Sequence, residues 1–71
     1  MTEKEFIDGL FDLMDAEEEF TMDTKLEDIP EWDSLSFVSF QADVKVKLGK
    51  KLVPQSVKDA KTVRDLYDLV K

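Results

Sequence analysis

Apolar residues recur at intervals of three and four near the start of the chain, which is the spacing of one face of an α-helix. Thr2 precedes this stretch and Glu5 follows three residues later. In that arrangement the hydroxyl and the carboxylate accept hydrogen bonds from free amides at a helix start. The pattern predicts a helix over residues 3–15 whose core-facing positions are Phe6, Ile7, Leu10, Phe11 and Met14.

The helical periodicity ends after residue 15, and residues 16–33 are predicted to form a long loop. Three consecutive glutamates repel one another there, and Pro30 disfavours helical dihedrals at Ile29. So long an irregular stretch in a compact domain counts either against the assignment or for a functional loop. The loop is expected to be ordered, pinned across the helix ends by Phe20, Met22, Leu26, Ile29 and Trp32.

A second helix is predicted over residues 34–48. Asp33 or Ser34 can cap its start, and Gly49 stands where a left-handed helix stop is common. Alternation of apolar residues and lysines over residues 44–48 would also fit a strand, but the cap and the upstream spacing favour the helix. Its apolar positions form two stripes that cannot both be buried, so some apolar surface should stay exposed: Leu35, Val38 and Ala42 in one, and Phe37, Phe40, Val44 and Leu48 in the other.

The remaining chain predicts a short helix and a final long one. A turn is expected at Val53–Pro54, with one or two helical turns around residues 56–60. Thr62 and Asp65 then form a second capping box, followed by core positions Val63, Leu66, Tyr67 and Val70. The expected fold class is all-α: a small four-helix bundle of three main helices and one short helix, with a long loop between the first two, in one domain of residues 1–71.

The amino-acid composition excludes several classes of function. The 71 residues include no Cys and no His, so thiolate or imidazole catalysis and sites ligated by either residue are excluded. The net charge of −7 argues against binding to nucleic acid or an anionic membrane. The acidic run lacks the alternating Asp pattern of a calcium loop, so no metal site is expected. No apolar run is long enough to span a membrane, and we expect a cytoplasmic monomer.

The charge is divided unevenly along the chain. Residues 1–34 contain 13 acidic and two basic side chains, a net charge of −11, whereas residues 35–71 contain four acidic and eight basic ones, a net charge of +4. The molecule should therefore be a charge dipole. This asymmetry is consistent either with simple solvation or with a docking role.

Ser34 is the residue that the sequence indicates as a site of covalent modification. A hydroxyl at a helix N-terminus lies where free amides and the helix dipole favour negative charge, so a phosphate ester would be stabilised there. No base able to activate Ser34 is evident. It is therefore interpreted as the acceptor of a group transferred by another enzyme, and the chain as a non-enzyme. The alternative is that Ser34 only caps the helix.

Asp33-Ser34-Leu35, after an acidic loop and at the start of an amphipathic helix, resembles the phosphopantetheine attachment site of acyl carrier proteins and their peptidyl and aminoacyl carrier relatives. The resemblance extends over nearly the whole chain, through length, acidity and the order of elements. It implies that Ser34 carries 4′-phosphopantetheine from coenzyme A through a phosphodiester. Asp33 would help a transferase and its metal engage the site, and Leu35 would contact the transferase and partner enzymes.

The resemblance also implies a function and partners. An acyl or aminoacyl group would travel as a thioester on the arm, which supplies the thiol that the chain lacks. The partners would be a phosphopantetheinyl transferase, an acyl or aminoacyl ligase, and a downstream transferase or synthase of lipid or secondary metabolite biosynthesis. Phe37 and Val38 would face partner or cargo, although a core position for one of them is as well supported. The sequence leaves the cargo open.

The second helix departs from that of carriers of fatty acid synthesis, which are acidic along it. Here Ser36 and Ser39 lie on the helix, and its far end is made basic by Lys45, Lys47, Lys50 and Lys51. This favours a specialised stand-alone carrier whose basic end meets an acidic patch on a dedicated partner, against the alternative of solvated lysines.

Two other functions compete with the carrier hypothesis. One is a helical protein–protein interaction module without prosthetic group, whose exposed apolar stripe docks on a partner helix while Ser34 is a simple cap. The other is a small hydrolase using Ser34 and a lysine base. The hydrolase is disfavoured because no lysine lies near Ser34 in the sequence and no oxyanion hole is evident.

Overall fold

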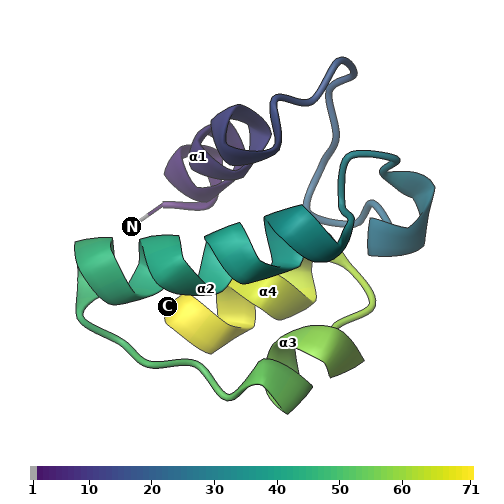
Figure 1. The fold of residues 1–71 in the computed structure, drawn as a ribbon. Coiled ribbons are helices and arrows are strands. Elements are labelled where there is room, and N and C mark those ends of the chain that lie inside the picture. The colour runs from purple at the N-terminus through teal and green to yellow at the C-terminus, as the bar shows by residue number, and fades with distance from the viewer. Residues whose placement is uncertain (1) are drawn as a thin grey trace.

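The computed structural model describes residues 2–71 and confirms the all-α fold class. Its helices are α1 (Glu3–Met14), α2 (Ser34–Leu48), α3 (Pro54–Asp59) and α4 (Val63–Val70), with one 3₁₀ turn, η1 (Leu26–Asp28). α1 packs on α2 and α4, and the short α3 packs on the same two helices from the opposite side (Figure 1). The expected arrangement of three main helices, one short helix and a long first loop is therefore present.

Local capping contacts explain where α1 begins and ends. The Thr2 hydroxyl accepts a hydrogen bond from the Glu5 amide at 3.1 Å, and the Glu5 carboxylate accepts one from the Thr2 amide at 2.8 Å. The predicted capping box is confirmed. The helix ends at Met14, one residue earlier than expected, because Asp15 adopts the left-handed conformation with φ of 52°.

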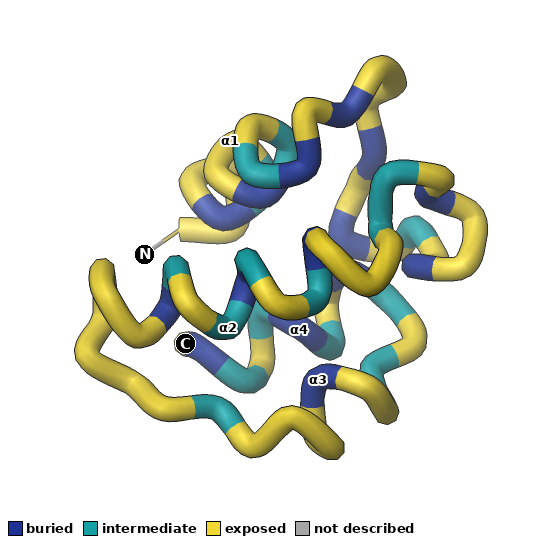
Figure 2. Tube along the Cα trace, in the orientation of Figure 1, coloured by how far each residue is buried: buried dark blue, intermediate teal, exposed yellow. Residues whose placement is uncertain are grey.

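The core lies between α1, α2 and α4. Phe6 of α1 makes edge-to-face contacts with Phe40 of α2 and Tyr67 of α4, with ring centroids 6.1 and 5.4 Å apart. Val63 and Leu66 of α4 are fully buried. Figure 2 shows buried positions recurring along these three helices, while most of the chain around α3 is exposed. Aromatic edge contacts of this kind hold three helices around one centre.

The long loop is ordered, as its apolar residues predict. Phe20, Met22, Leu26 and Ile29 are all buried in the core. The loop also pairs with the chain just before α4: the Leu26 amide donates to the Lys61 carbonyl at 2.9 Å. Similar backbone bonds join Thr24 to Val63 and Met22 to Arg64. These long-range backbone bonds were not foreseen from the sequence.

The short helix α3 begins at Pro54, two residues earlier than expected. A proline suits the first helical position because the amide hydrogen that it lacks would have no partner there. The final helix begins as predicted, since the Thr62 and Asp65 side chains each cap the other's backbone amide.

The two capping boxes make stability sensitive to acid. Hydrogen bonds from the Thr2 amide, and then from its hydroxyl, hold the pKa of the Glu5 carboxyl below its ordinary value of 4.5. The backbone amides of Lys61 and Thr62 likewise hold the pKa of the Asp65 carboxyl below its ordinary 3.8. A carboxylate whose pKa is lower in the folded state contributes stability above its unfolded pKa, and that contribution disappears as pH falls through the folded pKa.

We therefore expect the free energy of unfolding to lose the contribution of these two carboxylates as the pH falls from about 5 through the lowered pKa of each group. A variant with both Glu5→Gln and Asp65→Asn should lose less stability over that range than wild type, as measured by urea unfolding at several pH values. Glu18→Gln, an exposed loop change, is the control and should follow wild type. If the free energy of unfolding fell equally with pH in wild type and in the double variant, Glu5 and Asp65 would not be the source of the acid sensitivity.

Candidate functional site

Asp33, and not Ser34, caps α2. An Asp33 carboxylate oxygen accepts a hydrogen bond from the Ser36 amide at 3.0 Å, while the Asp33 backbone is extended. Ser34 is therefore the first helical residue. The alternative in which Ser34 serves only as the cap does not hold for its side chain, because Asp33 already fills that role.

The Ser34 hydroxyl lies exposed at the first turn of a 15-residue helix. Over residues 2–71 it makes no hydrogen bond to another group. The amino end of such a helix carries a partial positive charge that favours an attached anion. Leu35, the next residue, is 75% exposed, so Asp33, Ser34 and Leu35 are presented together at one end of α2.

A buried serine holds this end of the helix in place. Ser36 is only 7% exposed, and its hydroxyl donates a hydrogen bond of 2.6 Å to the Glu31 carbonyl. Trp32 packs edge-to-face on Phe40, with ring centroids 5.9 Å apart. The turn before Ser34 is thus held by two contacts, the hydrogen bond from Ser36 to Glu31 and the ring contact of Trp32 with Phe40. This structural role of Ser36 was not foreseen from the sequence, although its spacing of four from Phe40 marks it as a position on the buried stripe.

We expect Ser36→Ala to reduce the free energy of unfolding by about 1–3 kcal/mol, because the Glu31 carbonyl loses its partner in a partly buried setting. Urea unfolding followed by circular dichroism measures this change. Ser39→Ala, on the same helix and half-buried, is the matched control and should change stability by less. Equal effects of the two substitutions would show that the hydrogen bond to Glu31 adds nothing.

Two shallow hollows run along the face of α2 that looks toward α3. The first, of about 520 Å³, is lined by Trp32, Asp33, Ser34, Phe37, Val38, Val57 and Lys58. The second, of about 490 Å³, is lined by Phe37, Val38, Gln41, Ala42, Lys45, Lys51, Leu52 and Pro54. Because they share Phe37 and Val38, the hollows follow one another along the helix. We call the two together the α2–α3 groove, and Ser34 lies at one end of it.

The sequence left open whether Phe37 and Val38 face the core or face a partner or cargo. Phe37 is half-buried and packs against the core, whereas Val38 is 61% exposed. Both line the α2–α3 groove. The exposed apolar surface expected on α2 is confirmed, since Leu35, Val38 and Val46 are all exposed.

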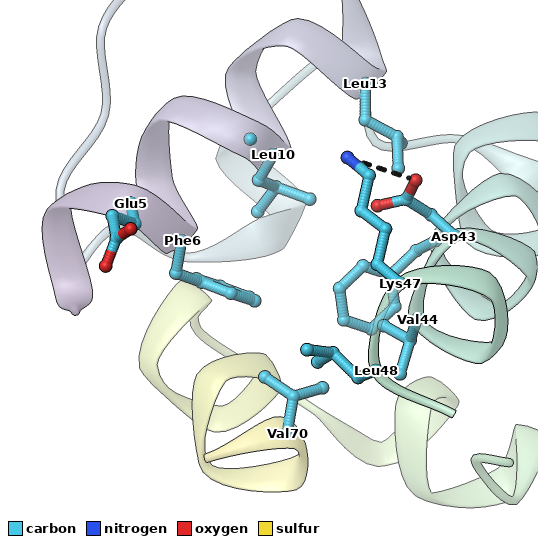
Figure 3. A pocket seen from close by; sticks show the side chains of 11 residues that line it. Glu5, Phe6, Leu10, Leu13, Asp43, Val44, Lys47, Leu48 and Val70 are labelled. Carbon is cyan, nitrogen blue, oxygen red and sulfur yellow. Dashed lines mark ion pairs between the residues drawn. The ribbon is translucent and has the colours of Figure 1, made fainter. Parts of the chain in front are cut away.

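Lys45 and Lys47 are not brought together. Lys45 lines the α2–α3 groove. Lys47 lies on the α1 side of α2, where its ammonium is 3.4 Å from the Asp43 carboxylate (Figure 3). The basic end inferred from the sequence is therefore divided between two sides of the helix. Lys58 of α3, which the sequence analysis passed over, lies in the same hollow as Ser34, and only the tertiary structure reveals that proximity.

A separate, more enclosed cavity of about 100 Å³ lies between α1, α2 and α4 (Figure 3). Leu10, Leu13, Phe40 and Val70 contribute apolar lining, and Lys47 and Asp43 stand beside it. Its lining from α2 begins at Phe40, so the cavity lies toward the end of that helix away from Ser34. It has room for only a few apolar carbon atoms.

Within residues 2–71, every helix is too short or too polar to cross a membrane. Across the same residues, no three acidic side chains converge on a point that could hold a metal ion. Comparisons of the chain with protein-family models, curated proteins and solved structures give no match.

Proposed function

We propose that the chain is a cytoplasmic, monomeric carrier protein that bears 4′-phosphopantetheine on Ser34 and presents an acyl or aminoacyl thioester to partner enzymes. The observation that carries the proposal is the exposed Ser34 hydroxyl, free of hydrogen bonds to the rest of residues 2–71, at the first turn of α2. Another protein can reach that oxygen without disturbing the fold. The thiol at the end of the arm supplies the thioester chemistry.

The residues around Ser34 fit a phosphodiester. The amino end of α2 favours a negative charge, and Lys58 across the hollow adds a cation. The open α2–α3 groove leaves room for a flexible chain beside Ser34, with Phe37 and Val38 as its apolar lining. Asp33 serves as the helix cap and stands next to the attachment oxygen, where a transferase and its divalent metal would approach.

Within residues 2–71 no side chain hydrogen-bonds to the Ser34 hydroxyl to activate it, which supports a carrier over an enzyme. The acid and the lysine that line the hollow, Asp33 and Lys58, make no hydrogen bond to the serine hydroxyl. The proton of that hydroxyl must therefore pass to a base on the transferase. The new bond joins Ser34 Oγ to the phosphorus that bears pantetheine in coenzyme A, and adenosine 3′,5′-bisphosphate leaves with the broken pyrophosphate bond.

Incubation of the chain with coenzyme A, Mg²⁺ and a broad-specificity phosphopantetheinyl transferase tests the proposal. Intact mass spectrometry should show one phosphopantetheine group added per chain, and fragmentation should locate it on Ser34. A chain that keeps its original mass while a known carrier is modified in the same tube would overturn the proposal. The downstream partners remain a ligase that loads the cargo and a transferase or synthase that receives it.

A second candidate function is a helical interaction module without prosthetic group. It is favoured by four exposed apolar side chains, Leu35, Val38 and Val46 on α2 and Val53 in the following loop, because large exposed apolar surfaces mark protein–protein contact sites. The mass experiment separates the two functions, since the module would gain no mass.

A further inference from the structure

Unpaired cations gather along the α2–α3 groove. Half of the eight basic side chains in residues 35–71 are engaged by acidic side chains or backbone carbonyls: Lys47, Lys50, Arg64 and Lys71. The ammonium groups of the other four make no ion pair or hydrogen bond within the described chain. Three of these four, Lys45, Lys51 and Lys58, line the groove.

The lysines border an apolar floor. At the end of the groove away from Ser34, Lys45 and Lys51 share the lining with one amide, Gln41, and five apolar residues: Phe37, Val38, Ala42, Leu52 and Pro54. No acidic residue lines that end. Asp33, the acid of the other end, is held by the Ser36 amide. A ligand that fits this end is therefore apolar along its length and negatively charged at its tip.

The position of the lysines relative to Ser34 sets where such a charge would lie. Lys45 is eleven residues beyond Ser34 on one continuous helix. A helix rises about 1.5 Å per residue, so the two residues are roughly 16 Å apart along the axis. An extended phosphopantetheine chain is of comparable length. Cargo joined to its end would thus meet Lys45 and Lys51, while the phosphodiester stayed near Lys58.

We infer that the α2–α3 groove binds cargo that ends in a carboxylate, such as the monothioester of a short dicarboxylic acid, with Lys45 and Lys51 as the groups that receive the charge. This inference rests on the proposed attachment at Ser34. The smaller cavity between α1, α2 and α4 is unsuited to such cargo, because it is largely apolar and its lining does not include Ser34. Surface lysines retain an anion weakly, which suits a group that must be handed on.

A matched pair of cargoes tests the inference. Succinyl and butyryl groups have the same four-carbon backbone, and only succinyl ends in a carboxylate. The transferase loads each from its coenzyme A thioester onto uniformly ¹⁵N-labelled protein, and intact mass confirms the loading. With ¹³C-labelled succinyl, the pKa of the terminal carboxyl should be a few tenths of a unit lower than in free succinyl-pantetheine. The reason is that two nearby exposed cations stabilise the carboxylate form. Amides of residues 42–52 should shift with succinyl and not with butyryl.

Charge-removing variants provide the controls. Lys45→Gln together with Lys51→Gln should return the succinyl titration to that of free succinyl-pantetheine, as should high salt, which screens exposed charges. Lys47→Gln removes a lysine on the opposite side of α2, already paired with Asp43, and should leave the titration unchanged. All three positions are exposed, so the fold should survive the substitutions.

Each contrary result is distinct. If both cargoes load and cause the same amide shifts, the anionic cargo site is overturned and the carrier function stands. The same conclusion follows if the double variant leaves the succinyl titration unchanged. Failure to load either cargo overturns the attachment at Ser34 and the cargo site with it. Concentration-dependent shifts of residues 42–52 in the unloaded protein would identify a second copy of the chain as the occupant and would also overturn the inference.

Discussion

We expect Ser34→Ala to abolish the proposed addition of phosphopantetheine and to leave the fold intact. The substitution removes the only atom to which the phosphodiester can be joined at that position, so the expected loss is complete. The fold should not change, because the Ser34 hydroxyl is exposed and Asp33 provides the helix cap. A surface substitution of this kind changes the free energy of unfolding by less than about 0.5 kcal/mol.

Intact mass and urea unfolding of the same samples check both halves of this prediction. Ser56→Ala, at an exposed position on α3, is the matched control and should be modified at the wild-type rate. Persistent modification of the Ser34→Ala protein would show that another hydroxyl is the acceptor. A loss of modification accompanied by unfolding would contradict the view that Ser34 plays no part in the stability of α2.

Leu66→Ala is expected to reduce the free energy of unfolding by about 2–5 kcal/mol. Leu66 is fully buried in α4, and its removal leaves a cavity where α4 meets the rest of the core. Domains are stable by roughly 0.05–0.15 kcal/mol per residue, so a chain of this length has a total stability of only about 4–11 kcal/mol. The substitution should therefore remove a large part of it.

Urea unfolding measures the loss, with Leu35→Ala as the control. The two substitutions delete the same atoms, but Leu35 is 75% exposed and should change stability little. If the two variants unfolded at the same urea concentration, α4 would not be packed on α1 and α3 as the structure describes. A Leu66→Ala chain that is unfolded without denaturant would agree with the prediction, because the lower limit of total stability lies within the expected loss.

The position of Ser34 could be predicted from the sequence more fully than its surroundings. The order Asp33, Ser34, Leu35 before an amphipathic stretch locates the start of α2, and the structure begins the helix there. The sequence left open which side chain caps the helix, because Asp and Ser are both good caps. Only the structure shows that the Asp33 carboxylate accepts a hydrogen bond from the Ser36 amide.

The positions of the charged side chains in space were harder to predict from the sequence than the ends of the helices. Lys45 and Lys47 are close in sequence, which suggested one basic end. Residues two apart on a helix point in quite different directions, so Lys47 pairs with Asp43 beside α1 whereas Lys45 borders the groove beside α3. Lys58 joins the Ser34 hollow from a different helix, and no pattern within the sequence links those two positions.

The sequence by itself determined the helices, because their limits depend on contacts between residues three or four positions apart. The capping boxes at Thr2 and Thr62, the cap at Asp33 and the left-handed Gly49 are all contacts or conformations of this local kind. The tertiary structure alone decided which stripe of α2 is buried and which borders the groove. That choice depends on helices distant in the sequence, since a stripe becomes core only where another element packs on it.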